Sequence, residues 1–269
     1  MGNPFFQDKV VIVTGASSGI GRELAYRLAA QGAGLSLASR DADRLEAVRA
    51  ECQARGGNAV SIPTDVAEPA QCEALIQKTM EQFGRIDILV NNAGISMWAP
   101  FEEVTDMGIF EKIMRVNYLG SVYCTYYSLS YLKQSRGQIV GVSSLTGKTG
   151  VPTRSGYAAS KHAMAGFFDT LRIELASAGV SVTMIYPGFV ATEVRTRAFG
   201  RDGQPLANSP VREKEIMTVE QCVDQMLPII QKRRRELVMT LRGKIGLWLK
   251  LIAPALVDNF ARKAVEGGK

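Results

Sequence analysis

Short apolar runs alternate with longer amphipathic stretches along most of the chain. The short runs are typical of buried strands and lie at Lys9–Thr14, Leu35–Ala38, Ala59–Ile62, Ile86–Val90, Gln138–Val142, Val180–Ile185 and Glu236–Met239. Helical periodicity is found between most of them, at about Ile20–Gln31, Arg44–Arg55, Pro69–Phe83, Phe110–Lys133, Tyr157–Ser177 and Val219–Lys232. Strands that are apolar on two faces and separated by helices predict an α/β fold with three layers, in which helices cover both faces of one seven-stranded parallel sheet.

Two segments depart from this alternation. Glu193–Glu215 is polar and rich in Gly, Pro and Arg. Because loops of this length are often functional, we predict a mobile lid there. The segment after Thr240 is apolar with interspersed basic residues. We therefore expect residues 1–240 to form one domain and residues 241–269 a basic, apolar helical tail.

Composition removes several classes of function. Hydrophobic residues make up 46% and charged residues 22% of the 269 residues, the balance of a globular chain that needs no disulfide or metal. The four cysteines are scattered with no close pair, and His162 is the only histidine. This argues against a disulfide framework, a zinc site or a histidine-based hydrolytic triad, and we expect no metal. A net charge of +6 favours anionic partners. Met1–Asp8 lacks the features of a signal peptide, so we expect a cytoplasmic protein.

A glycine-rich turn, TGASSGIG at Thr14–Gly21, follows the first predicted strand and opens the first predicted helix. Gly15, Gly19 and Gly21 allow a tight turn and let a pyrophosphate approach the backbone. The N–H groups and the positive end of the helix then favour the anion. A glycine-rich turn alone is weak evidence, but this strand–turn–helix context predicts a nucleotide site.

A second pattern, Tyr157-Ala-Ala-Ser-Lys161, opens a predicted helix. A separation of four residues places the phenol and the ammonium on one helix face. A free tyrosine titrates near ~10, and a nearby positive charge lowers that pKa toward the range that proton transfer needs. Ser144 ends the fifth predicted strand, at the sheet edge where such folds bind ligands. His162 and Ser143, next to these residues, are expected to be structural.

Together these motifs resemble the short-chain dehydrogenase/reductase family over roughly Lys9–Thr240. The turn has the family's Gly-x-x-x-Gly-x-Gly spacing, and Asn91-Asn92-Ala93-Gly94 is similar to its NNAG element. Ser144 precedes Tyr157 by the family's interval of thirteen residues. The resemblance implies the Rossmann version of the α/β fold. It also implies a set of cofactor-binding residues: Gly15, Ser17, Ser18, Gly19, Ile20, Gly21, Arg40, Asp65, Val66, Asn91, Ala93, Gly94, Tyr157, Lys161, Pro187, Gly188, Val190 and Thr192.

The same resemblance implies catalytic roles for four residues. Tyr157 gives a proton to a carbonyl oxygen during reduction and removes it during oxidation. Ser144 hydrogen-bonds that oxygen. Lys161 lowers the pKa of the tyrosine and holds the ribose, and Asn117 anchors a water that links Lys161 to solvent. Hydride chemistry belongs to the cofactor.

The end of the second predicted strand bears on the choice of cofactor. An acid there would pair with the ribose hydroxyls of NAD, whereas this strand ends in Ala38-Ser39-Arg40 with no acid until Asp41. Arg40 offers a bidentate grip on a 2′-phosphate, with Ser17 or Ser39 as hydroxyl donors. A surface arginine without that role is the alternative. We favour NADP(H).

The tail bears on partners. Ile245–Val257 is too short and interrupted to span a membrane. An apolar helix face of Leu247, Trp248, Leu251, Ile252 and Leu256, with basic neighbours, suits a membrane surface, a neighbouring subunit or a roof over the substrate pocket. SSLTGKTG resembles the membrane-associated branch of the family, with microsomal hydroxysteroid dehydrogenases and dehydrogenase/reductase member 7B.

These features favour an NADP(H)-dependent enzyme that interconverts a hydrophobic ketone or aldehyde and its alcohol, with steroid-like or lipid-like substrates implied by the resemblance. We expect a homo-oligomer, either a dimer or a tetramer. The alternative is a dinucleotide-sensing interaction protein without turnover, against which the complete set of four catalytic residues argues. Nucleic-acid binding is not expected, because the tail is too apolar for a phosphate-binding patch.

Overall fold

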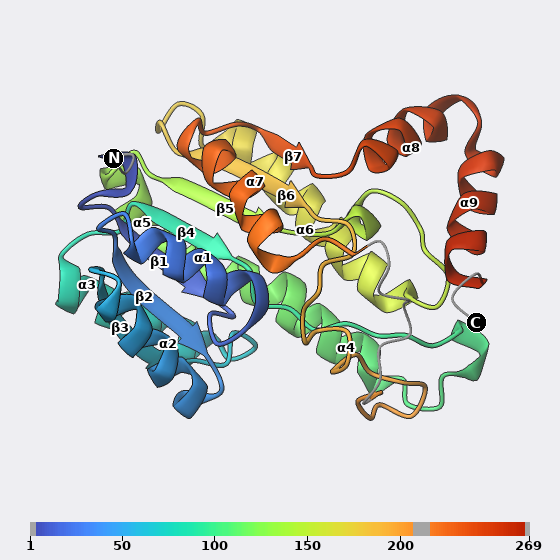
Figure 1. Cartoon of the computed structure of the whole chain (residues 1–269), viewed down its shortest axis with the longest axis horizontal. Helices are drawn as coiled ribbons and strands as arrows, with labels where there is room; N and C mark the ends of the chain where they lie inside the picture. The colour runs from blue at the N-terminus through green and yellow to red at the C-terminus, as the bar shows by residue number, and fades with distance from the viewer. Residues whose placement is uncertain (1–3, 207–215, 267–269) are drawn as a thin grey trace.

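The computed structural model describes residues 4–206 and 216–266. Its sheet has seven parallel strands in the order β3-β2-β1-β4-β5-β6-β7, as seen in Figure 1. The strands are β1 (Val10–Thr14), β2 (Gly34–Ser39), β3 (Asn58–Pro63), β4 (Ile88–Asn91), β5 (Gln138–Val142), β6 (Ser181–Tyr186) and β7 (Glu236–Val238). The predicted seven-stranded parallel sheet is confirmed, with strand ends shifted by one or two residues.

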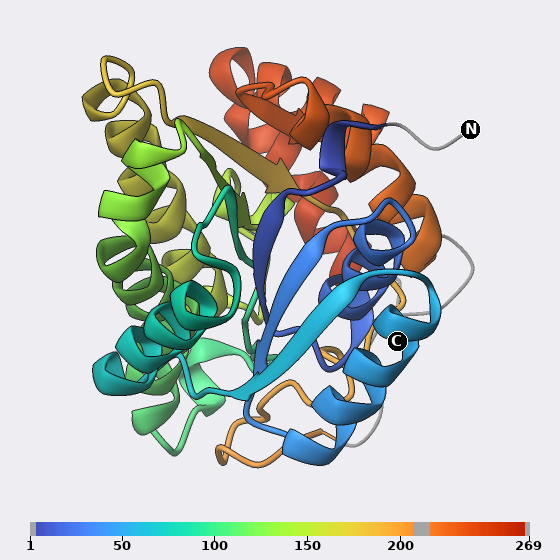
Figure 2. The same ribbon diagram turned by 90° about the vertical axis from the view of Figure 1, so that its left-hand side faces the viewer.

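Helices cover both faces of the sheet (Figure 2). They are α1 (Gly19–Ala29), α2 (Ala42–Ala54), α3 (Pro69–Phe83), α4 (Gly108–Met114), α5 (Gly120–Gln134), α6 (Ser155–Glu174) and α7 (Val219–Gln231). Val11 and Val13 of β1 pack with α1, α2 and α7, whereas Ile12 between them packs with α3, α5 and α6. This alternation along one strand creates two cores on opposite faces, and the predicted three layers are confirmed.

The helix that we predicted at Phe110–Lys133 is interrupted. A π-helical turn at Arg115–Leu119 separates α4 from α5. Asn117 lies in this turn, and its side chain accepts from the N–H of Ile95 at 2.8 Å and donates to the carbonyl of Ile95 at 2.9 Å. The side chain therefore ties the turn to the loop after β4. Single π turns inside helices often occur at functional sites.

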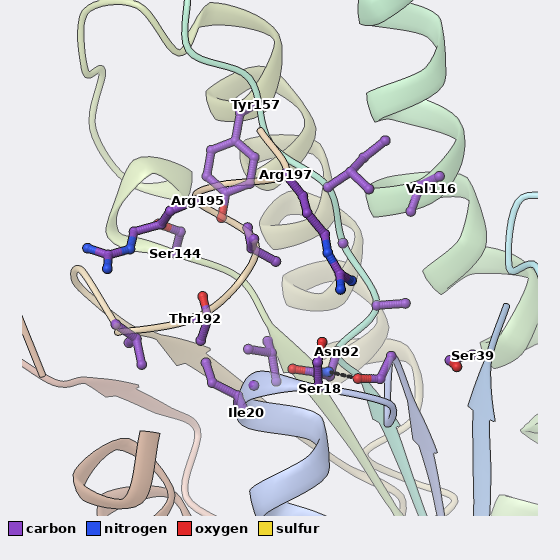
Figure 3. A pocket seen from close by; sticks show the side chains of 18 of the residues that line it. Ser18, Ile20, Ser39, Asn92, Val116, Ser144, Tyr157, Thr192, Arg195 and Arg197 are labelled. Atoms are coloured by element: carbon purple, nitrogen blue, oxygen red, sulfur yellow. Dashed lines mark hydrogen bonds between the residues drawn. The ribbon is translucent and has the colours of Figure 1, made fainter. Parts of the chain in front are cut away.

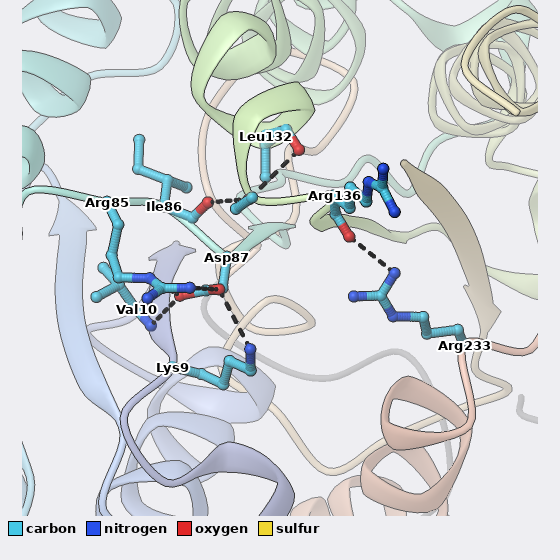
Figure 4. Close-up of polar contacts among 9 residues, drawn as sticks. Lys9, Val10, Arg85, Ile86, Asp87, Leu132, Arg136 and Arg233 are labelled. Carbon is cyan, nitrogen blue, oxygen red and sulfur yellow. Dashed lines mark hydrogen bonds and ion pairs between the residues drawn. The ribbon is translucent and has the colours of Figure 1, made fainter. Parts of the chain in front are cut away.

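A buried acid holds the amino-terminal edge of the sheet together (Figure 4). Asp87, 3% exposed, accepts from the Val10 N–H at 3.0 Å and from Arg85 at 2.8 and 2.9 Å, and lies 3.4 Å from the Lys9 ammonium. Burial opposes ionisation, but the Arg85 bonds, the Val10 N–H and the Lys9 charge outweigh it and lower the pKa of Asp87. Both oxygens of the Asp87 carboxylate therefore have partners.

The tail forms two helices. Helix α8 (Leu241–Ile252) is followed at once by α9 (Pro254–Glu266), because Pro254 cannot continue α8. The two helices extend away from the sheet in Figure 1. In the described ranges, no helix is long and apolar enough to cross a membrane. Of the predicted lid, residues 193–206 form an irregular loop, and 207–215 lie outside the described residues.

All four cysteines are free and buried. Two of them meet across the core, since the sulfurs of Cys72 on α3 and Cys124 on α5 lie 3.6 Å apart. The sequence gives no sign of this contact, because 52 residues separate the two positions.

Candidate active site

The strand order reverses between β1 and β4, and a cavity of about 490 Å³ opens at the carboxyl ends of the strands there. Open α/β sheets bind their ligands at such a switch point. Figure 3 shows the cavity between the first turn of α1, the loop after β4 and the loop after β6. Most of the predicted site residues line it: Gly15, Ser17, Ser18, Gly19, Ile20, Arg40, Asp65, Val66, Ala93, Gly94, Ser144, Tyr157, Lys161, Pro187, Gly188, Val190 and Thr192.

Three predicted residues do not line the cavity. Asn91 is buried, and its amide donates to the Thr125 hydroxyl at 3.2 Å. Gly21 acts from behind the turn, where an added Cβ would lie 2.4 Å from the Gly15 carbonyl oxygen. Asn117 is buried behind the loop after β4. Sequence reasoning missed several residues that line the cavity, among them Asn92, the second residue of the NNAG element, and the arginines Arg154 and Arg195.

The glycine-rich turn has the geometry of an anion cradle. Gly15 has a φ of +64°, and a Cβ there would lie 2.9 Å from the Ala93 Cα. Asn92 fixes the turn by donating to the carbonyls of Thr14 and Gly15 at 2.9 and 3.2 Å. Ser18 precedes α1 without a side-chain cap, so the first N–H groups of the helix face the cavity without that partner. The residues present therefore fit a dinucleotide pyrophosphate.

Ser144 lies at the end of β5 with one hydrogen bond already made. Its Oγ accepts from the N–H of Thr146 at 3.2 Å, which leaves its hydroxyl proton available to a ligand. Ser143 instead donates to the carbonyl of Lys161 at 3.2 Å, in line with its expected structural role. His162 is exposed on α6, where a ring nitrogen contacts the Ala158 carbonyl at 2.9 Å, and it does not line the cavity.

Tyr157 and Lys161 lie on the cavity side of α6, one turn apart. The Lys161 Nζ is 5.9 Å from the centre of the Tyr157 ring and donates to the Val142 carbonyl at 2.9 Å. Burial, and secondarily the charge of Arg154, lower the pKa of Lys161 to about 8. A Cβ on Gly94 would lie 3.2 Å from the Asn117 Oδ1 and 3.4 Å from the Lys161 Nζ. Because Gly94 has no side chain, the Asn117 amide and the Lys161 ammonium can both lie close to its backbone.

Arg40, Ser39 and Ser17 also line the cavity. Asp41 is the first acid after β2 and could in principle bind the ribose hydroxyls, but its carboxylate already has partners in the protein. Its carboxylate caps α2 by accepting from the Arg44 N–H at 3.1 Å and pairs with the Arg44 side chain at 3.3 Å. In the described part of the chain no carboxylate pairs with Arg40.

Residues 9–202 match the family model described as short chain dehydrogenase. The chain belongs to the short-chain dehydrogenase family. The predicted family is therefore confirmed, and it is a family of oxidoreductases.

Relatives place this short-chain dehydrogenase in the hydroxysteroid dehydrogenase-like branch. A dehydrogenase/reductase SDR family protein 7-like of Dictyostelium discoideum is 34% identical over 264 residues, which cover 96% of this chain and 82% of that protein. The 11-beta-hydroxysteroid dehydrogenase 1A of Arabidopsis thaliana is 35% identical over 257 residues, covering 93% and 73%.

Solved structures of the family share the fold. A Burkholderia phymatum short chain dehydrogenase/reductase in complex with NAD has a TM-score of 0.82 and 25% identity, covering 93% of this chain and 95% of its own. An alcohol dehydrogenase from Thermococcus sibiricus complexed with 5-hydroxy-NADP has a TM-score of 0.75 and 28% identity, covering 85% and 94%. Nicotinamide dinucleotides of either kind thus occur on this fold.

Proposed function

We propose that this short-chain dehydrogenase reduces a hydrophobic ketone or aldehyde to its alcohol with NADPH, and oxidises the alcohol in reverse. The observation that carries the proposal is that Ser144, Tyr157 and Lys161 line the same cavity as the glycine-rich turn. One chamber thereby holds a proton donor, a hydrogen-bond donor and a nucleotide cradle. Apolar side chains of Ile95 and Phe189 line it as well, and the names of the relatives support a steroid-like or lipid-like body for the substrate.

A nicotinamide cofactor in this cavity would supply the hydride. Tyr157 donates its phenolic proton to the carbonyl oxygen as negative charge develops there, and Ser144 donates a hydrogen bond to the same oxygen. The Lys161 ammonium stabilises the phenolate that remains. Asn117 fixes the loop after β4 through Ile95, and from beside Lys161 it can anchor the water through which the proton is replaced.

The part of the cavity that Arg40 lines favours NADP(H) as the cofactor. Arg40 is a cation without an acid partner in the described residues, and Ser17 and Ser39 line the same cavity. Asp41 is held by Arg44 and does not compete. A guanidinium recognises a phosphate monoester through two parallel charge-assisted bonds, which a plain ribose cannot accept.

Turnover of a neutral ketone panel with NADPH and NADH tests the proposal. Tyr157→Phe should lower kcat by at least about a thousandfold and leave the Kd for NADPH within about twofold, since the phenol acts on the substrate. Arg40→Ser should lower the preference for NADPH over NADH about 10–100-fold. Near-normal rates in Tyr157→Phe would remove the tyrosine from the mechanism. Tight NADPH binding by the wild type without turnover of any carbonyl would favour a dinucleotide sensor.

We propose in addition that α8 and α9 lie on an anionic membrane surface. Trp248, Leu251 and Ile252 are 75%, 75% and 82% exposed, so the helices present large apolar side chains to their surroundings. Basic residues stand beside them in the sequence at Arg242, Lys244 and Lys250. Exposed apolar side chains bordered by cations match the interface of acidic lipids.

Flotation with vesicles of phosphatidylserine and phosphatidylcholine separates this surface from a subunit interface. The full chain should float, and Trp248→Glu combined with Leu251→Glu should not. Measuring the oligomeric state of the same two proteins gives the alternative: a wild-type dimer or tetramer that dissociates in the double variant, with no flotation of either, assigns the helices to a neighbouring copy.

A further inference from the structure

Besides Arg40, two arginines that line the cavity have no acid partner among the described residues, and they lie near the proposed proton donor rather than near the glycine-rich turn. Arg154 directly precedes α6 and is 8% exposed, and Arg195 lies on the loop after β6. Both line the cavity together with Tyr157 and Ser144. Figure 3 shows Arg195 beside Ser144 and Tyr157, with Ser39 on the opposite side of the view.

Arg154 is held by rings and one hydroxyl. Its Cζ lies 4.4 Å from the centre of the Tyr157 ring and 5.1 Å from that of Trp98, and its Nη2 donates to the Ser96 Oγ at 2.6 Å. Its Nε is buried without a hydrogen-bond partner. A buried cation stacked between rings, with a donor unused, is costly to keep unless a ligand completes it.

Arg195, on the loop after β6, also has buried nitrogen atoms without hydrogen-bond partners. Its Nε and Nη1 are buried and have no hydrogen-bond partner. Arg197, two residues further along the chain, differs because it pairs with Glu193. In residues 4–206 and 216–266 no carboxylate lies within ion-pair distance of Arg154 or Arg195. Within the cavity Arg197 is therefore paired with an acid, whereas among the described residues Arg154 and Arg195 are not.

From this arrangement we infer that the substrate carries an anionic group, a carboxylate close to its carbonyl, which Arg154 and Arg195 bind while Tyr157 and Ser144 take the carbonyl oxygen. The inference rests on the proposed carbonyl chemistry and narrows its substrate to oxo acids with an apolar body. Arg154 stacks on the ring of the proposed proton donor, so an anion that it holds lies near the reacting carbon. Guanidinium forks bind carboxylates bidentately, which fits donors left unused.

Neutralising Arg154 would also act on Lys161. The charge of Arg154 is one of the two causes that lower the pKa of Lys161, together with burial. A carboxylate beside Arg154 offsets that charge, so the pKa of Lys161 should rise when the substrate anion binds. The ammonium would then persist to higher pH in the substrate complex than in the free protein.

Matched substrates test the inference. Benzoylformate and benzoylacetate carry a carboxylate one and two bonds from the carbonyl carbon, and acetophenone replaces that arm by a methyl group. We expect Arg195→Gln and Arg154→Gln to lower kcat/KM for at least one of the acids about 10–100-fold, through KM, and to change acetophenone turnover less than about threefold. Arg197→Gln, whose arginine lines the same cavity but is paired, is the control and should change neither ratio. Because Arg195 is on a loop, its variant keeps the test usable if Arg154→Gln does not fold.

Three results would overturn the inference. One is equal loss on the acids and acetophenone, which indicates a general structural role. Another is no loss on either acid. The third is an equal rise in the Kd for NADPH, which assigns the arginines to the cofactor phosphates. In each case turnover of acetophenone by the wild type would leave the proposed carbonyl reduction standing, whereas failure of all carbonyls would reject the proposed function itself.

Discussion

The two edges of the sheet treat buried charge in opposite ways. At the amino edge, Asp87 is surrounded by Arg85, Lys9 and a backbone N–H, so its charge is compensated within the protein. At the carboxyl edge, Lys161 and Arg154 are also buried, yet Lys161 has a carbonyl and Arg154 a hydroxyl in place of an acid. The first arrangement stabilises the fold, and the second leaves cations for ligands to complete.

The largest effect should follow from breaking the compensated edge. Asp87→Asn removes the charge that Arg85 and Lys9 neutralise, and urea unfolding should show a loss of about 2–4 kcal/mol. Glu51→Gln, which breaks the exposed pair with Arg55 on α2, should cost at most about 1 kcal/mol. Activity per folded molecule should be unchanged in both. An equal cost for the two variants would contradict the compensated role of Asp87.

The free energy of unfolding should depend on pH through Asp87. The pKa of Asp87 is lowered in the folded protein, so the stabilisation is present above the ordinary carboxyl pKa and is lost as pH falls through the folded value. The Asp87→Asn variant should lose less stability than the wild type over that range.

A smaller effect of opposite sign is expected at the other edge. Lys161→Met removes an ammonium whose protonation is disfavoured by burial, and should stabilise the protein without ligands by about 1–3 kcal/mol at neutral pH while abolishing turnover. The lowered pKa means that wild-type stability should rise from pH 8 to 10.5, where the unfolded chain holds a proton that the folded one has lost. A variant less stable than the wild type in thermal denaturation would show that the Val142 hydrogen bond outweighs the buried charge.

The smallest expected effect concerns nucleotide binding. As pH rises above about 8, Lys161 loses its charge, and the Kd for NADPH should increase by at most about tenfold per pH unit. The charge of Arg154 and the ring of Tyr157 face the same ammonium. Fluorescence titration from neutral to alkaline pH measures the trend, and Lys161→Arg should flatten it because a guanidinium stays charged. A wild-type Kd that does not change with pH would remove Lys161 from nucleotide binding.

What the sequence could predict follows from how local each signal is. The seven strands and the Tyr157–Lys161 pair depend on periodicity and on spacing along one helix, so they were predicted correctly. The sequence does not separate Asn91 from Asn92, and in the structure it is Asn92, just after β4, that lines the cavity. The unpaired state of Arg154 could not be predicted, since it depends on where every acid of the fold lies.

The tail and the helix after the NNAG element differ in how clearly the sequence marks their breaks. In the tail, Pro254 interrupts the apolar run Ile245–Val257, and in the structure α8 ends and α9 begins there. The interruption at Arg115–Leu119 contains no proline. It coincides with side-chain bonds from Asn117 to a distant loop, which a helical periodicity does not report.

Because of the π turn at Arg115–Leu119, the position of Asn117 depends on the number of residues between α4 and α5. It accommodates an additional residue within an otherwise α-helical rod, and the surplus is where Asn117 sits. Deleting a single residue between Arg115 and Leu119 would let the rod close into uninterrupted α geometry and still cover the sheet. The amide would then swing by about 100° around the axis, away from Ile95 and Lys161. An alignment gap of one position here would therefore signal a relative that keeps the architecture but has lost this amide from beside the lysine.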